Sequence, residues 1–331
     1  MKARVLLLFL VLLLPASAPA LTVKLGTLAP AGTPWDDALK KLAAMWSELS
    51  AGSVTLKIYP GAVAGNEQDM IRQMRFGQLQ AGAITGDGLE VIVPDMIIPT
   101  LPFLFNSQSE IEEVLPQVLP EYKKEFADKG FVLLGWTVAG WINFFSRSPV
   151  VYPSDLQSQK LAVSGTNADV VQAWKLTGFH VVPLSTPDLM SGLSSGLIDA
   201  LYTSPLAAAA YQWFGIANNM CALRMSPLLG GIIVTERTWN QIPQALRPQL
   251  EAAAVTVMKP LYADTHALEL SAVSVMEKNG LTVNQVPPNA VARWRSLLAT
   301  GYLPLKGKAF SAELYDKVIG LINAYRETHA N

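Results

Sequence analysis

Cysteine and histidine are scarce in this chain, with one Cys (Cys221) and three His among 331 residues. A single cysteine excludes an intramolecular disulfide, so burial of apolar side chains must hold the fold together. The cysteine and the histidines are scattered without the spacing of metal ligands, so no metal and no other cofactor is expected. Charged residues make up only 15% of the chain, and no basic cluster marks a nucleic-acid or membrane-surface binder.

Long apolar runs are also lacking after the first 14 residues, because charge, Gly or Pro interrupts each later one. The early run over 5–14 follows Lys2 and Arg4 and precedes a stretch of small residues, which is typical of a secretory signal peptide. We therefore expect cleavage after Ala20 and a periplasmic mature protein. The alternative is an uncleaved N-terminal anchor.

Apolar residues, in contrast, are abundant, at 50% of the chain. This fraction is high for a soluble protein with so few charges, and it indicates that some apolar surface is reserved for a ligand or a partner. The length of the chain allows about two domains.

Strand and helix patterns alternate along the chain, which predicts an α/β fold with mostly parallel, helix-covered sheets. In the first half, the patterns indicate strands over 22–28, 54–59 and 81–84, with helices over 35–49 and 67–76. After Val150 the same order restarts, with strands over 160–163, 180–182 and 197–202 and helices over 167–176 and 187–193. Two lobes are therefore expected, with an apolar strand over 230–234 passing back between them and long helices within 244–278.

Six short blocks resemble, in their order, the extracytoplasmic substrate-binding subunits of TRAP transporters, the DctP-like family. The blocks span essentially the whole mature chain: 59–61 with 64–67, 101–105, 153–156 leading into Lys160, 182–184 with Asp188, 193–196 before Asp199, and 238–243. Each block alone is a weak match, but six in the right order make the resemblance specific.

The resemblance implies a two-lobe periplasmic-binding-protein fold, with a ligand cleft between the lobes, hinge strands and a long connecting helix. It places lobe I at 21–139 and 228–267 and lobe II at 140–227 and 268–331, after the signal peptide at 1–20. It also implies a function without catalysis. The lobes would close around a small molecule, and integral membrane TRAP transporter subunits would receive it from the closed form.

The family's clamp for anionic ligands is missing from this chain. In most members, an Arg at the end of the strand after the Pro-x-Asp-Leu block grips a carboxylate in a bidentate contact, and here that position is Ala162. A second family Arg, in a Gly-x-Arg pattern, falls on Ile142, and an Asn before a Pro corresponds to Ser204. A carboxylate buried without its cation is disfavoured by several kcal/mol. We therefore expect no binding of a simple carboxylate in the family's usual way.

The expected cleft is instead apolar and aromatic, with a few polar contacts such as Thr203, and it suits an apolar or weakly polar ligand. The residues expected to bind the ligand are Leu28, Thr85, Trp141, Ile142, Asn143, Phe144, Ala162, Met190, Leu201, Tyr202, Ser204 and Trp213. Glu67 and Asp69 lie in the first turn of a helix, where the helix dipole favours acidic side chains, so they need no functional role.

Other functions stay open at this point. An organic-acid binder could use a different cation, Arg147 or Lys160. An interaction protein with a reduced cleft could dock a tetratricopeptide-repeat periplasmic partner. The string Gly-Leu-Ser-Ser-Gly over 192–196 matches the nucleophile pattern of a serine hydrolase around Ser194, but a short helix leads into a strand here, which is the reverse of the required order.

Overall fold

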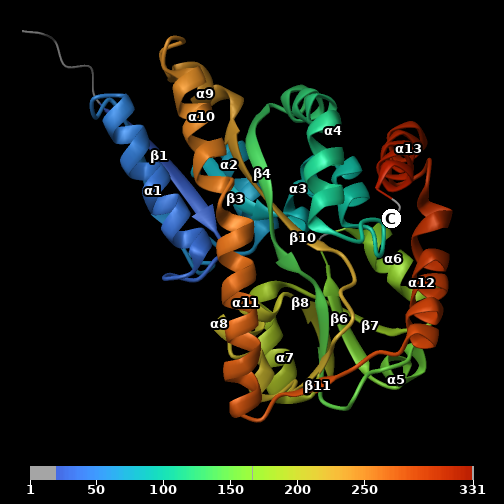
Figure 1. Cartoon of the computed structure of the whole chain (residues 1–331). Coiled ribbons are helices and arrows are strands. Elements are labelled where there is room, and N and C mark those ends of the chain that lie inside the picture. Colours follow the sequence, from blue (N-terminus) through green and yellow to red (C-terminus); the bar gives the residue numbers. More distant parts are fainter. Residues whose placement is uncertain (1–19, 166, 330–331) are drawn as a thin grey trace, which may run out of the picture.

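The computed structural model describes residues 20–165 and 167–329, which form two lobes stacked one above the other (Figure 1). The predicted α/β class and the two-lobe arrangement are confirmed, with one mixed sheet in each lobe. Within the described residues, no helix combines the length and the apolar character that crossing a membrane requires. The predicted signal peptide lies almost entirely outside these residues.

The sheet of the first lobe has five strands in the order β2-β1-β3-β10-β4. Their bounds are β1 (Leu21–Thr27), β2 (Val54–Tyr59), β3 (Ala81–Thr85), β4 (Phe131–Trp141) and β10 (Pro227–Thr235). Strand β1 runs parallel to β2 and β3, whereas β10 is antiparallel to β3 and β4. The predicted strand over 230–234 is therefore an inner strand of this sheet.

Helices cover both faces of the first sheet. One face packs on α1 (Pro34–Leu49) and α10 (Arg247–Met258), where the buried Trp46 donates its indole N–H to the carbonyl of Leu250 at 3.0 Å. The other face packs on α2 (Glu67–Phe76) and α4 (Gln108–Asp128). Further elements of this lobe are α3 (Gly86–Ile92), the 3₁₀ turn η1 (Pro94–Thr100) and α9 (Glu236–Gln241).

The sheet of the second lobe has six strands in the order β11-β9-β5-β8-β6-β7. Their bounds are β5 (Asn143–Ser146), β6 (Lys160–Ser164), β7 (His180–Leu184), β8 (Ala200–Thr203), β9 (Asn219–Cys221) and β11 (Thr282–Asn284). The helices packed on this sheet are α5 (Pro153–Gln157), α6 (Ala168–Leu176), α7 (Leu189–Ser195), α8 (Pro205–Ala210) and α12 (Pro288–Tyr302). Short 3₁₀ turns complete it at η2 (Thr186–Asp188), η3 (Trp213–Gly215) and η4 (Leu303–Leu305).

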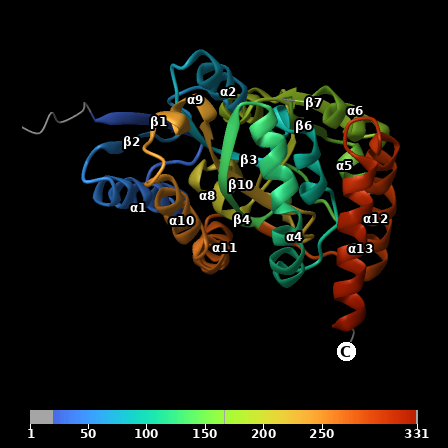
Figure 2. The ribbon, with the colours of Figure 1, turned by 90° about the horizontal axis from the view of Figure 1, so that it is seen from above.

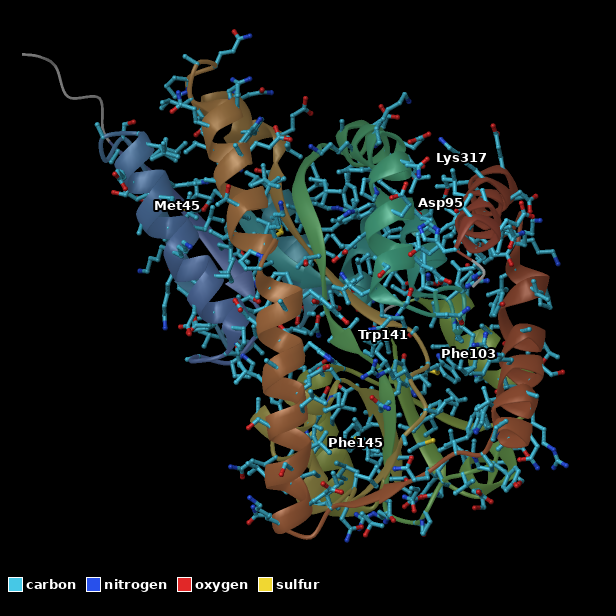
Figure 3. The ribbon with its side chains drawn as sticks, viewed as in Figure 1. Met45, Asp95, Phe103, Trp141, Phe145 and Lys317 are labelled. Atoms are coloured by element: carbon cyan, nitrogen blue, oxygen red, sulfur yellow. The ribbon has the colours of Figure 1, made fainter. Side chains whose placement is uncertain are left out.

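Strands and one long helix join the lobes. Strand β4 ends at Trp141, and after one residue the chain continues as β5 in the other sheet. Trp141 lies at the level where the lobes meet, whereas Phe145 lies inside the second lobe (Figure 3). Helix α11 (Leu261–Lys278) runs alongside both lobes and contacts β4 of the first and α8 of the second (Figure 1).

The last helix packs against the first lobe, whereas its segment was expected to belong to the second. The chain segment 268–331 was assigned to lobe II, but α13 (Ala312–Thr328) packs against α4 and contributes to the core of the first lobe. Figure 2 shows α12 and α13 together on the side of the molecule opposite α1. The physical reason is that α13 has an apolar stripe, with Leu314, Val318 and Ile322 buried, that the first lobe covers. The other boundaries stay a prediction.

Candidate functional site

A cavity of about 200 Å³ lies between the two lobes, and a smaller one of about 70 Å³ shares part of its wall. We call the two together the cleft. The residues common to both are Leu28, Glu67, Asp87, Thr186, Leu189 and Tyr202. The cleft lies at the carboxyl ends of β1, β3, β6 and β8, which is where α/β sheets usually bind ligands.

Apolar side chains from both lobes make up most of the larger cavity. They include Leu28, Ile84, Ile142, Leu206, Trp213 and Leu229. The rings of Tyr211 and Trp213 are stacked with centroids 4.5 Å apart, so they form one flat aromatic wall. Such a wall can bury an apolar or aromatic ligand body.

Several contacts join the lobes around the cleft. Tyr211, which ends α8, donates its hydroxyl to the carbonyl of Leu28, which follows β1. On the far side, Arg295 of α12 donates to the side chain of Asn106 at 2.8 Å. Both bonds join residues of different lobes and therefore stabilise the lobe arrangement seen here.

Glu67 reaches the cleft from the first turn of α2. Thr85 donates its backbone N–H to one carboxylate oxygen at 2.6 Å and its hydroxyl to the other at 2.8 Å. The approach to α3 is so close that a Cβ on Gly88 would lie 2.8 Å from Glu67 Oε2. Burial raises the pKa of Glu67 to about 7, although the hydrogen bonds from Thr85 oppose this rise.

Asp87 lies beside Glu67 and reaches across to the second lobe. It accepts a hydrogen bond from the side chain of Ser164 at the end of β6, while burial raises its pKa. The backbone N–H of Ser164 in turn donates to the hydroxyl of Tyr202 at 3.3 Å. Asp87 therefore belongs to a polar connection between the lobes at the floor of the cleft.

A third carboxyl, Glu90, lies one turn after Asp87 on α3. It is only 4% exposed, and its Oε1 has no hydrogen-bond partner in the described part of the chain. Burial raises the pKa of Glu90 well above its ordinary value, and the charges of Asp87 and Glu67 raise it further. Glu90 does not line the cleft, but it interacts electrostatically with the two carboxyls that do.

Cationic side chains are absent from the walls of the cleft, as far as the described residues go. Ile142 lines the larger cavity and Ala162 the smaller one; these are the two positions where the sequence resemblance predicted the family arginines. Arg147 and Lys160, the cations considered as replacements, both lie 3.7 Å from Asp199 and do not line the cleft. The electrostatic character of the cleft is therefore the opposite of an anion clamp.

The structure brings most of the predicted site residues to the cleft. Those that line it are Leu28, Thr85, Ile142, Ala162, Leu201, Tyr202, Thr203, Ser204 and Trp213. Their role in ligand binding stays a prediction.

Four predicted residues do not line the cleft, because the cores use them. Asn143 donates to the carbonyls of Cys221 and Leu223 at 2.9 and 3.0 Å and so holds β5 to the loop after β9. Phe144 is fully buried and stacks on Trp294, with ring centroids 5.1 Å apart. Trp141 belongs to the core of the first lobe, and Met190 packs against the core of the second.

Sequence reasoning missed the acidic residues of the cleft. Glu67 was assigned no functional role because its place in a helical first turn accounts for it locally, yet it lines both cavities. Asp87 was not singled out at all. Its position just after the strand β3 is the signal that could have found it, because residues that follow parallel strands meet at one edge of a sheet.

Neither the predicted serine nucleophile nor a group of metal ligands forms a site in the described residues. Ser194 donates its hydroxyl to the carbonyl of Met190, one turn earlier in α7, and it lies outside the cleft. Across 20–165 and 167–329, no three His, Cys, Asp or Glu side chains are grouped so that they could hold a metal ion. The chemistry that the cleft offers is binding.

Comparisons with known proteins agree with this arrangement. A solute-binding protein of Roseobacter denitrificans is 25% identical over 290 residues, which cover 83% of this chain and 87% of that protein. A TRAP periplasmic solute-binding protein of Xanthobacter autotrophicus, solved with bound β-D-galacturonate, superposes with a TM-score of 0.84 at 23% identity over 91% of this chain and 99% of that one. A TRAP periplasmic solute-binding protein of Desulfovibrio salexigens, solved with bound orotic acid, gives a TM-score of 0.84 at 19% identity, with coverage of 91% and 99%.

The family model for bacterial extracellular solute-binding protein family 7, named DctP, matches residues 25–304. This match spans both sheets and every strand that contributes to the cleft. The resemblance read from the six sequence blocks is thereby confirmed. The chain belongs to the DctP family of bacterial extracellular solute-binding proteins and is a binding protein, not an enzyme.

Proposed function

We propose that this solute-binding protein captures a small molecule with a largely apolar body, without a carboxylate clamp, and delivers it to TRAP membrane subunits. The observation that carries the proposal is the composition of the cleft. Ala162 and Ile142, which we expect at the family's cation positions, line the cleft, and the charged residues that line its described walls are the acids Glu67 and Asp87.

Energetics favour such a ligand. Burying about 200 Å² of apolar ligand surface contributes roughly 5 kcal/mol, from which the entropic costs of binding must be subtracted. A carboxylate ligand would lose its hydration and meet the charges of Glu67 and Asp87 without a compensating cation. Hydrogen bonds from the polar wall residues add orientation to the apolar contacts.

Closure of the lobes supplies the transport signal. Each lobe provides part of the wall, so a ligand contacts both only when they are closed, and binding shifts the population toward that form. The bond from Tyr211 to Leu28 forms across the same gap. We infer that the membrane subunits recognise this closed form, and that the precursor is exported through a signal peptide cleaved after Ala20.

The organic-acid alternative has support only from relatives. The two solved proteins described above hold a uronic acid and orotic acid, but at 23% and 19% identity they show the shared fold alone. In this chain an acid would need a cation from outside the described walls of the cleft.

The docking alternative is disfavoured by the cleft itself. A cavity of about 200 Å³ is not a filled, vestigial groove. A tetratricopeptide-repeat partner stays a prediction without support.

A ligand screen with the purified mature protein tests the proposal. Thermal unfolding is followed with succinate, galacturonate and a panel of neutral or basic aromatic and alkyl compounds. We expect saturable stabilisation by members of the apolar panel and none by the acids. Micromolar binding of succinate or galacturonate, with none in the apolar panel, would contradict the proposal.

A further inference from the structure

Glu67 and Asp87 line one corner of the cleft, with Glu90 behind them, and no cationic side chain of residues 20–165 and 167–329 lines the cleft. Asp87 and Glu90 are three residues apart on α3 and therefore share one face of that helix. Glu67 comes from α2 and lies against the same helix, in contact with Thr85 and Gly88. Two carboxyls, Glu67 and Asp87, therefore line a largely apolar cavity, and the third, Glu90, lies behind them and does not line it.

Glu90 gives an independent sign that this corner is incomplete. It is 4% exposed, and its Oε1 has no hydrogen-bond partner among the described residues. The charges of Asp87 and Glu67 act on it, and its own charge acts on Tyr202. A buried carboxylate oxygen without a partner is rare in a folded protein, because its desolvation is not compensated. Three neighbouring carboxyls cannot all ionise in a buried place unless a cation joins them.

The other residues that line the cavity indicate what the rest of the ligand is like. Ile142, Leu206 and Trp213 line the same cavity as Glu67 and Asp87. A ligand in this space therefore meets acid at one end and aliphatic or aromatic side chains at the other. A volume of about 200 Å³ fits one ring or a short chain with a single polar group.

We propose that the ligand is a protonated amine with an apolar body, whose ammonium group is held at Glu67 and Asp87, with Glu90 adding negative charge from behind. This inference rests on the proposed function and names its substrate class. The ammonium group supplies the positive charge that the walls lack, and the carboxylates supply acceptors for its N–H donors. The aromatic faces nearby favour a cation as well.

Three compounds of similar shape test the charge: 2-phenylethylamine, 2-phenylethanol and 3-phenylpropanoate. Each is titrated calorimetrically into the mature protein at a pH near 8, where the amine is still protonated. We expect the amine to bind at least about tenfold more tightly than the alcohol, and the acid more weakly than both. Asp87→Asn should lower the affinity for the amine by about tenfold or more and leave that for the alcohol within about threefold.

Asp69→Asn is the matched control, because Asp69 is on the same helix as Glu67 but pairs with Arg72 and does not line the cleft. It should change none of the three affinities. Circular dichroism and the affinity for the alcohol show that the Asp87 variant is folded.

The possible failures are distinguishable. Equal binding of the amine and the alcohol overturns the charge assignment and leaves the apolar ligand of the proposed function in place. Binding of the acid alone overturns both, as does no binding of any of the three. The ligand retained by protein purified from its own periplasm gives a second test by native mass spectrometry. A basic nitrogen in that molecule supports the inference, and a carboxylic acid without one overturns it.

Discussion

The carboxylate of Glu269, on the long helix α11, lies directly against Gly140, two residues before the chain passes from β4 into the second lobe. A Cβ on Gly140 would overlap this carboxylate, and the backbone N–H of Trp141 donates to it. Gly140 has φ +121°, a value that L side chains rarely adopt. Glu269 therefore connects α11 to β4 near the point where the chain crosses between the lobes.

Gly140→Ala is predicted to destabilise the protein, because it adds a clash with Glu269 to the strain of the positive φ. Gly280→Ala is the matched control, since Gly280 also has a positive φ, +98°, but has open space around its Cβ position. We expect the Gly140 variant to lose about 2 kcal/mol more than the control in urea unfolding. Equal losses for the two variants would show that Glu269 moves aside freely.

Stability is predicted to fall as the pH rises through the neutral range. Burial raises the pKa of Glu269 from 4.5 to about 8, while the charge of Arg224 opposes this rise. Between these two values the folded state holds a proton that the unfolded state has released, so the free energy of unfolding decreases with increasing pH. Glu67, with its pKa raised to about 7, acts in the same direction.

Glu269→Gln should flatten this pH dependence by up to a few kcal/mol across the interval. Chemical unfolding at several pH values between 5 and about 8.5 measures the slope. Glu277→Gln, a change at an exposed position of the same helix, serves as the control. A slope that is the same in the wild type and both variants would show that Glu269 ionises normally.

An arginine introduced at residue 162 is predicted to bind a carboxylate ligand only when Asp87 is neutralised as well. In Ala162→Arg alone, the new guanidinium should pair with Asp87, which lines the same cavity. Combined with Asp87→Asn, it is freed to bind a carboxylate, and galacturonate or succinate should then bind measurably in calorimetry. Ala162 is only 3% exposed, so both variants should also lose stability. Strong succinate binding by the single variant would show that Asp87 does not compete.

Removal of the hydroxyl of Tyr211 is predicted to weaken closure without unfolding either lobe. Tyr211→Phe deletes the bond to the Leu28 carbonyl, which is worth about 1 kcal/mol, and ligand affinity should fall about fivefold. Small-angle scattering should show a larger average radius for the ligand-free variant. Tyr325→Phe on α13, which lies outside the cleft, is the control. Unchanged affinity in the Tyr211 variant would place the closing contacts elsewhere.

The sequence predicted most accurately those elements whose ends are set by capping residues next to them in the chain. The helix over 67–76 has the observed bounds, because Asn66 caps its start and Gly77, with φ +77°, ends it. The strand over 197–202 was placed too early. The N–H of Ile198 bonds to the carbonyl of Gly192 in the preceding helix, and the strand begins only at Ala200.

The site was predicted only in part, because sequence patterns report on neighbouring residues and not on residues that folding brings together. The absence of a cation at Ala162 and Ile142 was predicted from the sequence blocks that resemble the family, and both residues do line the cleft. The gathering of Glu67, Asp87 and Glu90 could not, because it depends on how α2 and α3 meet in space. Each acid has an ordinary explanation on its own helix, and only their proximity shows that they act together.

The placement of α13 constrains how the molecule can open. The chain passes between lobes at β4, β10 and α11, and again between α12 and α13, which lie on the flank away from α11 (Figure 1). If the lobes opened by rotating about the flank that carries α11, the chain between α12 and α13 on the opposite flank would be stretched. We therefore expect the connection between α12 and α13 to limit how far the lobes separate when the ligand is released, and cutting the chain near Gly307 should let them separate further.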